Sequence, residues 1–177
     1  MLRAKFIFCF VSVILMGALC ARAAEQKYVK YDDPKGRFHM DHPEDWKQRN
    51  PNSPNVLVVF LHERADFGDN INIVSAQLPT EMNEDDLDKV FRQVLPKQMQ
   101  DFHLISDEPE ELSGHHVHRM VYTASMQTHK LFVTQVCLTS GRTNYTITFT
   151  MLPDRQKELQ PIIDHVLKSF KLEEKGK

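Results

Sequence analysis

The stretch that decides the fold is residues 117–151, which read VHRMVYTASMQTHKLFVTQVCLTSGRTNYTITFTM. It contains three runs of nine residues, 117–125, 130–138 and 143–151, that are rich in β-branched and aromatic side chains, as strands are. Only four residues separate one run from the next, so the three strands form an antiparallel meander. The middle run is apolar on both faces, whereas the last run alternates apolar and polar residues. We therefore expect both faces of the middle strand to be covered.

More strands precede the meander. Residues 27–31 and 37–42 predict a hairpin, and residues 56–61 and 71–76 predict a second pair of strands. The run at 56–61 is continuously apolar, which predicts that both of its faces are covered. Closer to the meander, residues 102–106 predict a short strand and residues 110–114 a connection.

Two amphipathic helices complete the pattern. The first has an apolar stripe at i, i+3, i+4 and i+7 formed by Leu87, Val90, Phe91 and Val94. Asn83 is its predicted N-cap, and Pro96 is expected to end or kink it.

The second helix closes the chain and carries a longer apolar stripe, which must lie on the sheet: Leu159, Ile162, Ile163, Val166, Leu167 and Phe170. Pro161 is expected in its first turn. Strands predominate and their joins are tight, so the predicted class is α+β, with a mostly antiparallel β-sheet packed by helices. We expect one domain over residues 24–172 and a frayed tail at 173–177.

The N-terminus has the three-part pattern of a secretory signal peptide. Two basic residues, Arg3 and Lys5, precede an apolar run at 6–19, and small residues flank Arg22. Residues 1–23 are predicted to be removed, and the run is too short for a membrane span. Two alternatives stay open: an uncleaved anchor, or lipidation of Cys20.

Removing the signal leaves 154 residues with 19 basic and 24 acidic side chains, a formal charge of −5. A mildly acidic domain without a basic cluster argues against nucleic acid or an anionic membrane as the partner. Cys137 is the only cysteine after residue 23, so no intramolecular disulfide can form in the mature chain. Its place in the middle strand predicts that it is buried.

The order of these elements resembles the PsbP-like superfamily. The match rests on residues 38–46, an apolar strand followed by Pro43 and Trp46, on residues 112–114 leading into the meander, and on the closing helix that ends at residues 169–172. This superfamily shares its fold with a eukaryotic Ran-binding factor and with bacterial DcrB-type envelope proteins. The resemblance implies an α/β/α sandwich and a binding or accessory role rather than an enzyme.

The predicted hairpin and the resemblance together assign structural roles to residues 31–46. Pro34 and Gly36 form the turn of the first hairpin, and Phe38 and Met40 face the core. Trp46, the only tryptophan, is expected to cover the sheet edge as a large apolar plug.

Histidines form the most suggestive cluster. His116 and His118 project to one face of a strand, and paired imidazoles suit Zn²⁺ or Cu²⁺. A metal site needs further ligands, of which His129 across the hairpin is one candidate. The alternative is that these histidines are solvated surface groups.

Evidence for catalysis is weak. His39 and His42 lie near Asp41 and could contribute to an acid–base pair, but no nucleophile elbow, metalloprotease motif or phosphate loop accompanies them. No catalytic residue and no cofactor are therefore predicted. The methionines are not periodic with one another, so they fill the core or line an apolar groove for a lipid or peptide: Met82, Met99, Met120, Met126 and Met151.

The sequence thus predicts an exported, non-enzymatic binding or accessory protein of the bacterial cell envelope, periplasmic or secreted. Its partner is an unidentified envelope protein or small ligand. The alternative is a small-ligand or metal carrier that uses the face bearing His116 and His118.

Overall fold

The computed structural model describes residues 26–49, 51 and 53–173. The predicted signal peptide, its cleavage site, Cys20 and the tail beyond Glu173 lie outside the described residues. In the part of the chain that is described, no helix is long and apolar enough to cross a membrane.

Within the described ranges, ten strands form two antiparallel sheets. The larger sheet has seven strands, in the order β3 (Lys47–Arg49), β4 (Val56–His62), β5 (Asp69–Gln77), β9 (Thr143–Met151), β8 (His129–Ser140), β7 (His115–Met126) and β6 (Gln100–Leu112). The smaller sheet has three, in the order β1 (Tyr28–Asp32), β2 (Phe38–Pro43) and β10 (Lys171–Leu172).

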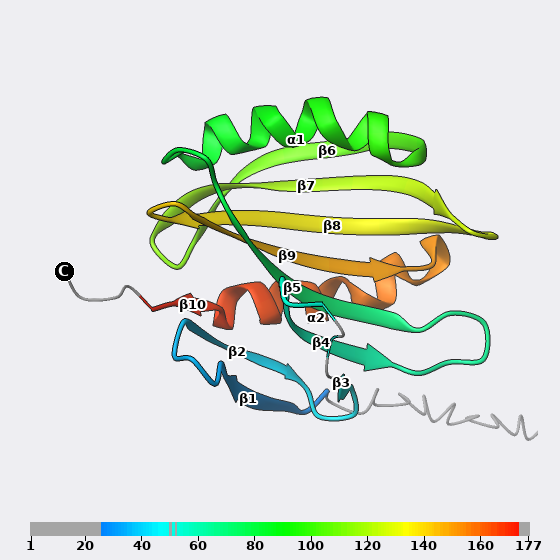
Figure 1. Ribbon diagram of the computed structural model, residues 1–177. Coiled ribbons are helices and arrows are strands. Elements are labelled where there is room, and N and C mark those ends of the chain that lie inside the picture. Colours follow the sequence, from blue (N-terminus) through cyan, green and yellow to red (C-terminus); the bar gives the residue numbers. More distant parts are fainter. Residues whose placement is uncertain (1–25, 50, 52, 174–177) are drawn as a thin grey trace, which may run out of the picture.

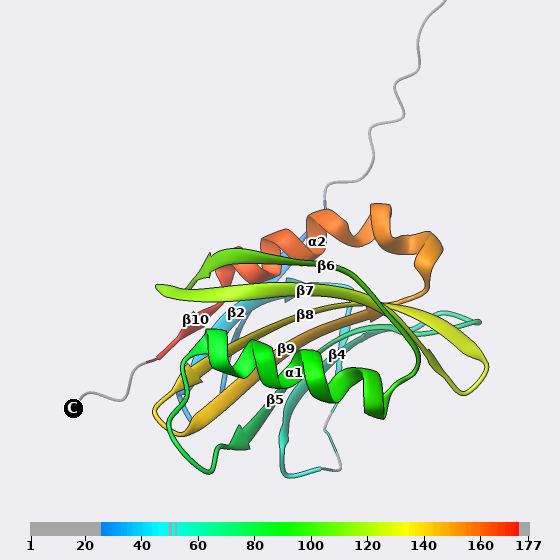
Figure 2. The same cartoon turned by 90° about the horizontal axis from the view of Figure 1, so that it is seen from above.

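The helices lie on opposite faces of the large sheet. Helix α1 (Glu84–Gln98) packs on β6, β7 and β8, while α2 (Gln156–Ser169) packs on β2 and follows the short 3₁₀ turn η1 (Pro153–Arg155). Seen from above, α1 and α2 flank the sheet, and the small sheet shares the layer of α2 (Figure 2). In Figure 1, α1 lies beside β6 at the top, and β1 and β2 of the small sheet lie below α2 at the bottom. The predicted α+β class and the sandwich implied by the resemblance are both confirmed.

The meander is confirmed and is longer than the sequence predicted. Strand β7 begins at His115 and β8 runs to Ser140, so only two residues join each pair of strands. Gln127 and Gly141 take left-handed backbone conformations at these turns, with φ of 54° and 56°. Such conformations are typical of tight hairpins.

The prediction for residues 102–114 was wrong in part, since residues 102–106 form a strand but residues 110–112 continue it. Instead of a short strand and a connection, one strand, β6, covers residues 100–112 and pairs with β7 along its length, with two register shifts. Pro109 and the neighbouring acidic residues obscured this strand in the sequence. They are tolerated because β6 is the edge of the sheet, where a missing N–H costs no ladder bond and charges prevent further pairing.

The prediction for the strand at 56–61 was also wrong in part. In β4 only Val58 and Phe60 are fully buried, and the residues of the other face are half-buried. Helix α1 packs on β6, β7 and β8, so it does not cover this strand. The short strands β3 and β10 carry too few residues for a sequence pattern and were not predicted.

Helix α1 has the predicted N-cap, since the Asn83 side chain accepts a hydrogen bond from the Asp86 N–H. Pro96 does not end the helix, which continues to Gln98. The buried stripe is also shifted: Leu87 and Leu95 are buried, whereas Val90 is 42% exposed.

Helix α2 begins at Gln156, so the expectation that Pro161 lies in its first turn was wrong. The turn η1 leads directly into the helix, and Pro161 lies in its interior. The apolar stripe packs as predicted, with Phe170 fully buried at the C-cap.

Among the residues that the structure describes, two apolar clusters form the core. The larger lies between the sheet and the layer that contains α2, and it includes Phe38, Met40 and Trp46. The smaller lies beneath α1 and is built around Leu95, Met120 and Tyr122. Trp46 is 4% exposed and stacks on His62 with ring centroids 5.6 Å apart, which fits its predicted role as a buried plug.

Candidate functional site

The face of the large sheet that carries α1 is only partly covered. Helix α1 contacts β6, β7 and β8, which leaves β5 and β9 open on this face. Because side chains alternate along a strand, β9 turns its apolar residues toward α2 and its threonines toward the open face. Asn72 of β5 lies opposite Thr148 of β9, so this part of the surface is neutral and polar.

A pocket of about 190 Å³ opens where the covered and uncovered parts of this face meet. Strands β5, β7, β8 and β9 form its floor, and Met99 contributes from the C-terminal end of α1. Its lining residues are Asn72, Met99, Tyr122, Ala124, Ser125, Met126, Leu131, Val133, Thr148 and Thr150. The pocket has an apolar interior and neutral polar groups at its β5–β9 side.

The chemistry of this pocket suits binding rather than acid–base catalysis. Among the described residues, none that lines it carries a charge at neutral pH. Burial raises the pKa of Tyr122 well above its usual range, and the Tyr122 hydroxyl donates a hydrogen bond to Gln135 Oε1 at 3.2 Å. The phenol is therefore held neutral.

Two of the five methionines that suggested an apolar groove in the sequence line this pocket. Met99 and Met126 line it, and Met126 is 57% exposed. Met120 belongs to the apolar cluster beneath α1, and Met151 belongs to the cluster on the opposite face. Sequence spacing could not reveal the pocket, because its methionines come from a helix end and a hairpin.

His116 and His118 contact different acidic side chains. His116 is exposed and pairs with Glu111, with Nδ1 and Oε1 2.8 Å apart. His129 faces Met126 at the far end of the β7–β8 hairpin, so it cannot reach His118.

His118 instead lies among acidic groups from two other elements. Its Nδ1 is 3.1 Å from Asp107 Oδ1 on β6, and its Nε2 is 3.2 Å from Asp85 Oδ1 on α1. One ligand-type atom from each of Asp88, Asp107 and His118 lies within 4.8 Å of the other two. Asp107 could not be identified from the sequence because its strand was not recognised over residues 107–112, and Asp85 and Asp88 approach His118 only through the packing of α1 on the sheet.

One arginine bridges the acids of this cluster. Arg92 Nε donates to Asp88 Oδ2 at 2.9 Å, and the guanidinium forms an ion pair with Asp107. Burial and the neighbouring charge of Asp88 raise the pKa of Asp107, although Arg92 and His118 oppose the shift. The cluster therefore carries more negative charge than its arginine neutralises.

A small cavity of about 10 Å³, enough for one water molecule, adjoins the cluster beneath α1. Glu84, Asp88, His118 and Cys137 are among its lining residues. Cys137 is half-buried rather than fully buried, since it faces this cavity. Burial raises the pKa of its thiol to about 12, against the opposing effect of contacts with Thr146 and Gln135.

The histidines near Asp41 do not form an acid–base pair with it. His39 Nδ1 lies 2.9 Å from Glu173 Oε1, and Asp41 pairs with His165 of α2. His42 stacks on Phe60 with ring centroids 3.9 Å apart. These contacts join the small sheet to the neighbouring layers.

A family model described as DcrB matches residues 38–169 of the chain. No curated protein shows a significant match.

Several solved structures share the fold. Cyanobacterial PsbP (CyanoP) from Synechocystis sp. PCC 6803 is 18% identical, with a TM-score of 0.62 over 87% of this chain and 97% of that one. LpqN of Mycobacterium tuberculosis, described as involved in cell envelope biogenesis, is 13% identical, with a TM-score of 0.63 over 82% and 90%. The Ran-binding protein Mog1p of Saccharomyces cerevisiae is 7% identical, with a TM-score of 0.61 over 85% and 97%. These structures confirm the fold that the resemblance implied, and the match to the DcrB family model confirms the resemblance itself.

Proposed function

Because the chain belongs to the DcrB family, we propose that it is a non-enzymatic binding or accessory protein of the bacterial cell envelope. The signal-peptide pattern of residues 1–23 supports export to the periplasm or beyond. The shared fold with LpqN, a protein described as involved in cell envelope biogenesis, is in keeping with this compartment.

The observation that carries the proposal is the uncharged pocket on the α1 face. At about 190 Å³ it is somewhat larger than a 150 Å³ cavity that takes up benzene. It therefore suits one large apolar side chain of a partner protein. Pockets that receive a single aromatic or aliphatic anchor contribute most of the affinity in many interfaces.

The groups around the pocket fit a peptide or protein as the occupant. Asn72, Ser125 and Thr148 present neutral donors and acceptors at its margin, which suit the backbone of a bound segment. Met99 and Met126 have flexible, polarizable side chains that adapt to the shape of an apolar anchor.

A variant that fills the pocket tests this proposal. Ala124 is 3% exposed and lies in the pocket wall, so Ala124→Phe places a ring in the space that an anchor would occupy. We expect this variant to lose at least about nine-tenths of the partner recovered by crosslinked pull-down from the envelope fraction, as expected when an interface anchor is excluded.

The matched control is Val29→Phe, which adds the same ring to a 37% exposed position on β1, away from the pocket. It should recover the same partner as the unmodified protein. Thermal unfolding of both variants verifies that they are folded. Equal recovery by Ala124→Phe and the unmodified protein would mean that the pocket does not receive the partner.

A further inference from the structure

We propose that Asp88, Asp107 and His118 bind a divalent transition-metal ion of the Zn²⁺ class. The site is separate from the apolar pocket and uses different residues. The metal-binding proposal can therefore be tested independently of the proposed function. One ligand comes from α1, one from β6 and one from β7.

The three side chains converge because of the register between β6 and β7. Asp107 lies opposite Met120, and His118 lies opposite Pro109, so Asp107 and His118 are diagonal neighbours on the face covered by α1. Asp88 reaches the same point from the buried side of the helix.

The spacing needs only a small contraction to bind a metal. Ligand atoms of a tetrahedral zinc site lie about 3.3 Å apart, given metal–ligand bonds of about 2.0–2.1 Å. Here Asp107 Oδ1 and His118 Nδ1 are 3.1 Å apart, and the three potential ligand atoms lie within 4.8 Å of one another. Rotation of the Asp88 carboxylate or a small shift of α1 would complete the approach.

Metal-binding histidines usually donate a hydrogen bond from their second ring nitrogen to a carboxylate or carbonyl, an outer partner that orients the ring. Asp85 is in the position to be this partner for His118. The second ring nitrogen of His118, Nε2, lies 3.2 Å from Asp85 Oδ1. When Nδ1 faces the metal, Nε2–H donates to this carboxylate, which fixes the tautomer and orientation of the ring. Asp85 is thus a positioning residue rather than a ligand.

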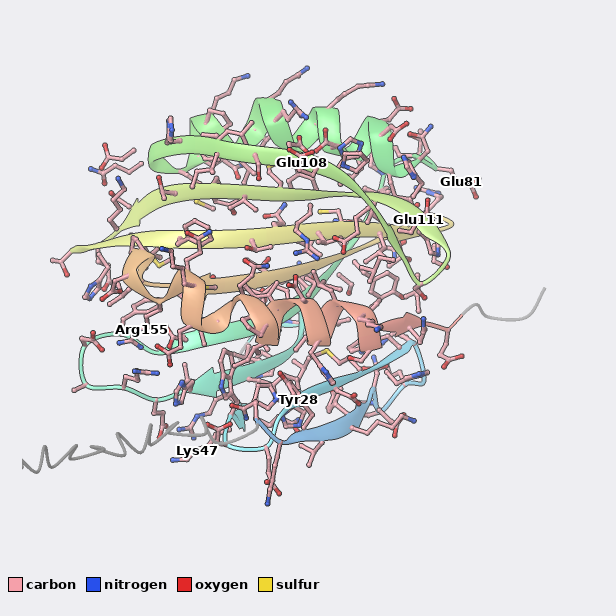
Figure 3. All side chains as sticks on the ribbon, turned by 180° about the vertical axis from the view of Figure 1, so that it is seen from behind. Tyr28, Lys47, Glu81, Glu108, Glu111 and Arg155 are labelled. Carbon is pink, nitrogen blue, oxygen red and sulfur yellow. The ribbon has the colours of Figure 1, made fainter. Side chains whose placement is uncertain are left out.

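The Asp107 carboxylate is buried at the centre of the proposed site. The Asp107 side chain is only 4% exposed, with the Arg92 guanidinium in ion-pair contact with Oδ2 and His118 Nδ1 3.1 Å from Oδ1. The carboxylates of Asp88 and Asp107 share this one guanidinium, and the Asp85 carboxylate lies against His118. Two further acids, Glu81 and Glu111, lie together at the end of the molecule opposite Arg155 (Figure 3).

The cavity beneath the cluster provides a place for a fourth ligand. It has room for about one water molecule and is lined by Asp88 and His118 themselves, together with Glu84 and Cys137. A water molecule there would complete a four-coordinate site.

The donor set favours Zn²⁺ over Ca²⁺ or Mg²⁺. Imidazole nitrogen is a usual ligand for zinc, whereas Ca²⁺ and Mg²⁺ prefer six or more oxygen ligands. Two carboxylates and one imidazole with an open fourth position fit the smaller coordination number.

Arg92 competes with the metal for the same two carboxylates. Its side chain is 45% exposed, so it can move to solvent when a cation replaces it. Replacing Arg92 by a neutral residue should therefore strengthen metal binding. An ion-pair cluster whose only role is structural would show no such gain.

The test is calorimetric titration of the exported chain, purified without an affinity tag, with ZnCl₂. We expect one ion per chain with a dissociation constant below about 10 μM. His118→Gln and Asp107→Asn should each weaken binding at least about tenfold, and Asp85→Asn should weaken it about 10- to 100-fold through loss of the outer partner. Arg92→Gln should tighten it, and CaCl₂ should give no binding.

His116→Gln is the matched control, because His116 lies two residues away on the same strand but is exposed and outside the cluster. Binding should be unchanged in this variant. Zinc should also raise the thermal midpoint of the unmodified protein but not that of His118→Gln, since an ion that binds only the folded state stabilises it. Absence of zinc binding, or loss of binding in His116→Gln with retention in His118→Gln, would overturn the proposal.

Discussion

Asp69 is the most deeply buried charged side chain in the described part of the molecule. It is fully buried and accepts a hydrogen bond of 2.8 Å from Arg155 Nη1, while its Oδ1 has no hydrogen-bond partner. Arg155 also donates to both carboxylate oxygens of Asp66 at 2.9 and 3.0 Å. The pair joins β5 to the turn before α2, two segments 86 residues apart.

Replacing Arg155 by methionine should destabilise the protein strongly. The change leaves the Asp69 carboxylate buried without its hydrogen-bonded cation, which typically costs about 3–5 kcal/mol. Chemical denaturation gives the difference in the free energy of unfolding.

Arg64→Met is the control for this measurement. Arg64 lies 3.6 Å from Asp69 but is 32% exposed and pairs with the exposed Glu158, so its loss should cost about 1 kcal/mol or less. Equal losses in the two variants would contradict the assignment of Arg155 as the main partner of Asp69.

The positions of some single residues could be predicted from the sequence, whereas the contacts of others could not. Trp46, Phe38 and Met40 were placed in the core correctly, because large apolar side chains are seldom exposed in a folded domain. The neighbours of His118 were missed, since Asp88 and Asp107 reach it through tertiary contacts that no local pattern records.

Among the elements, the β1–β2 hairpin depends on one carboxylate in its turn. Asp33 is buried and accepts hydrogen bonds from the backbone N–H groups of Lys35 and Arg37 and from the Arg37 guanidinium. Burial alone would raise the pKa of Asp33, but these hydrogen bonds and the Arg37 charge outweigh it and hold the pKa below the ordinary 3.8.

The stabilisation from Asp33 should therefore depend on pH. A lowered pKa in the folded state means that the contribution is complete above the ordinary value and is lost as the pH falls through the lowered one. Asp33→Asn should cost about 1.5–3 kcal/mol at pH 7, as hydrogen bonds to charged groups do, and much less in acid.

Urea unfolding at neutral pH and at about pH 2–3, below the ordinary range for aspartate, measures this difference. Asp32→Asn serves as the control, because Asp32 is exposed and pairs only with the exposed Lys30. A cost for Asp33→Asn that does not change with pH would contradict the proposed role of the carboxylate.

The boundaries of helices and strands could be predicted where the hydrophobic periodicity was strong. The predictions were wrong where tertiary contacts determine where an element begins or ends. The meander followed from alternation and short links. The extension of β6 through Pro109 depends on its place at the sheet edge, and the continuation of α2 around Pro161 depends on packing over the core. Neither position in the fold can be read from local residues.

At the scale of the whole molecule, the arrangement of layers creates the candidate binding surface. The apolar stripe of α2 and the small sheet cover one face of the large sheet, whereas α1 covers only part of the other (Figure 2). The sequence predicted both helices and the class of fold. It could not predict which strands α1 leaves open, because that depends on the path of the chain between β5 and β6.

The most direct test of the central claim is methyl NMR of the protein labelled at methionine, titrated with toluene as a minimal apolar anchor. The methyl signals of Met99 and Met126 should shift in a saturable manner, because both side chains line the pocket. Those of Met40 and Met151, which lie in the core on the other face, should stay in place. Unchanged signals from Met99 and Met126, or equal shifts at all four methionines, would contradict the assignment of this pocket as the binding site.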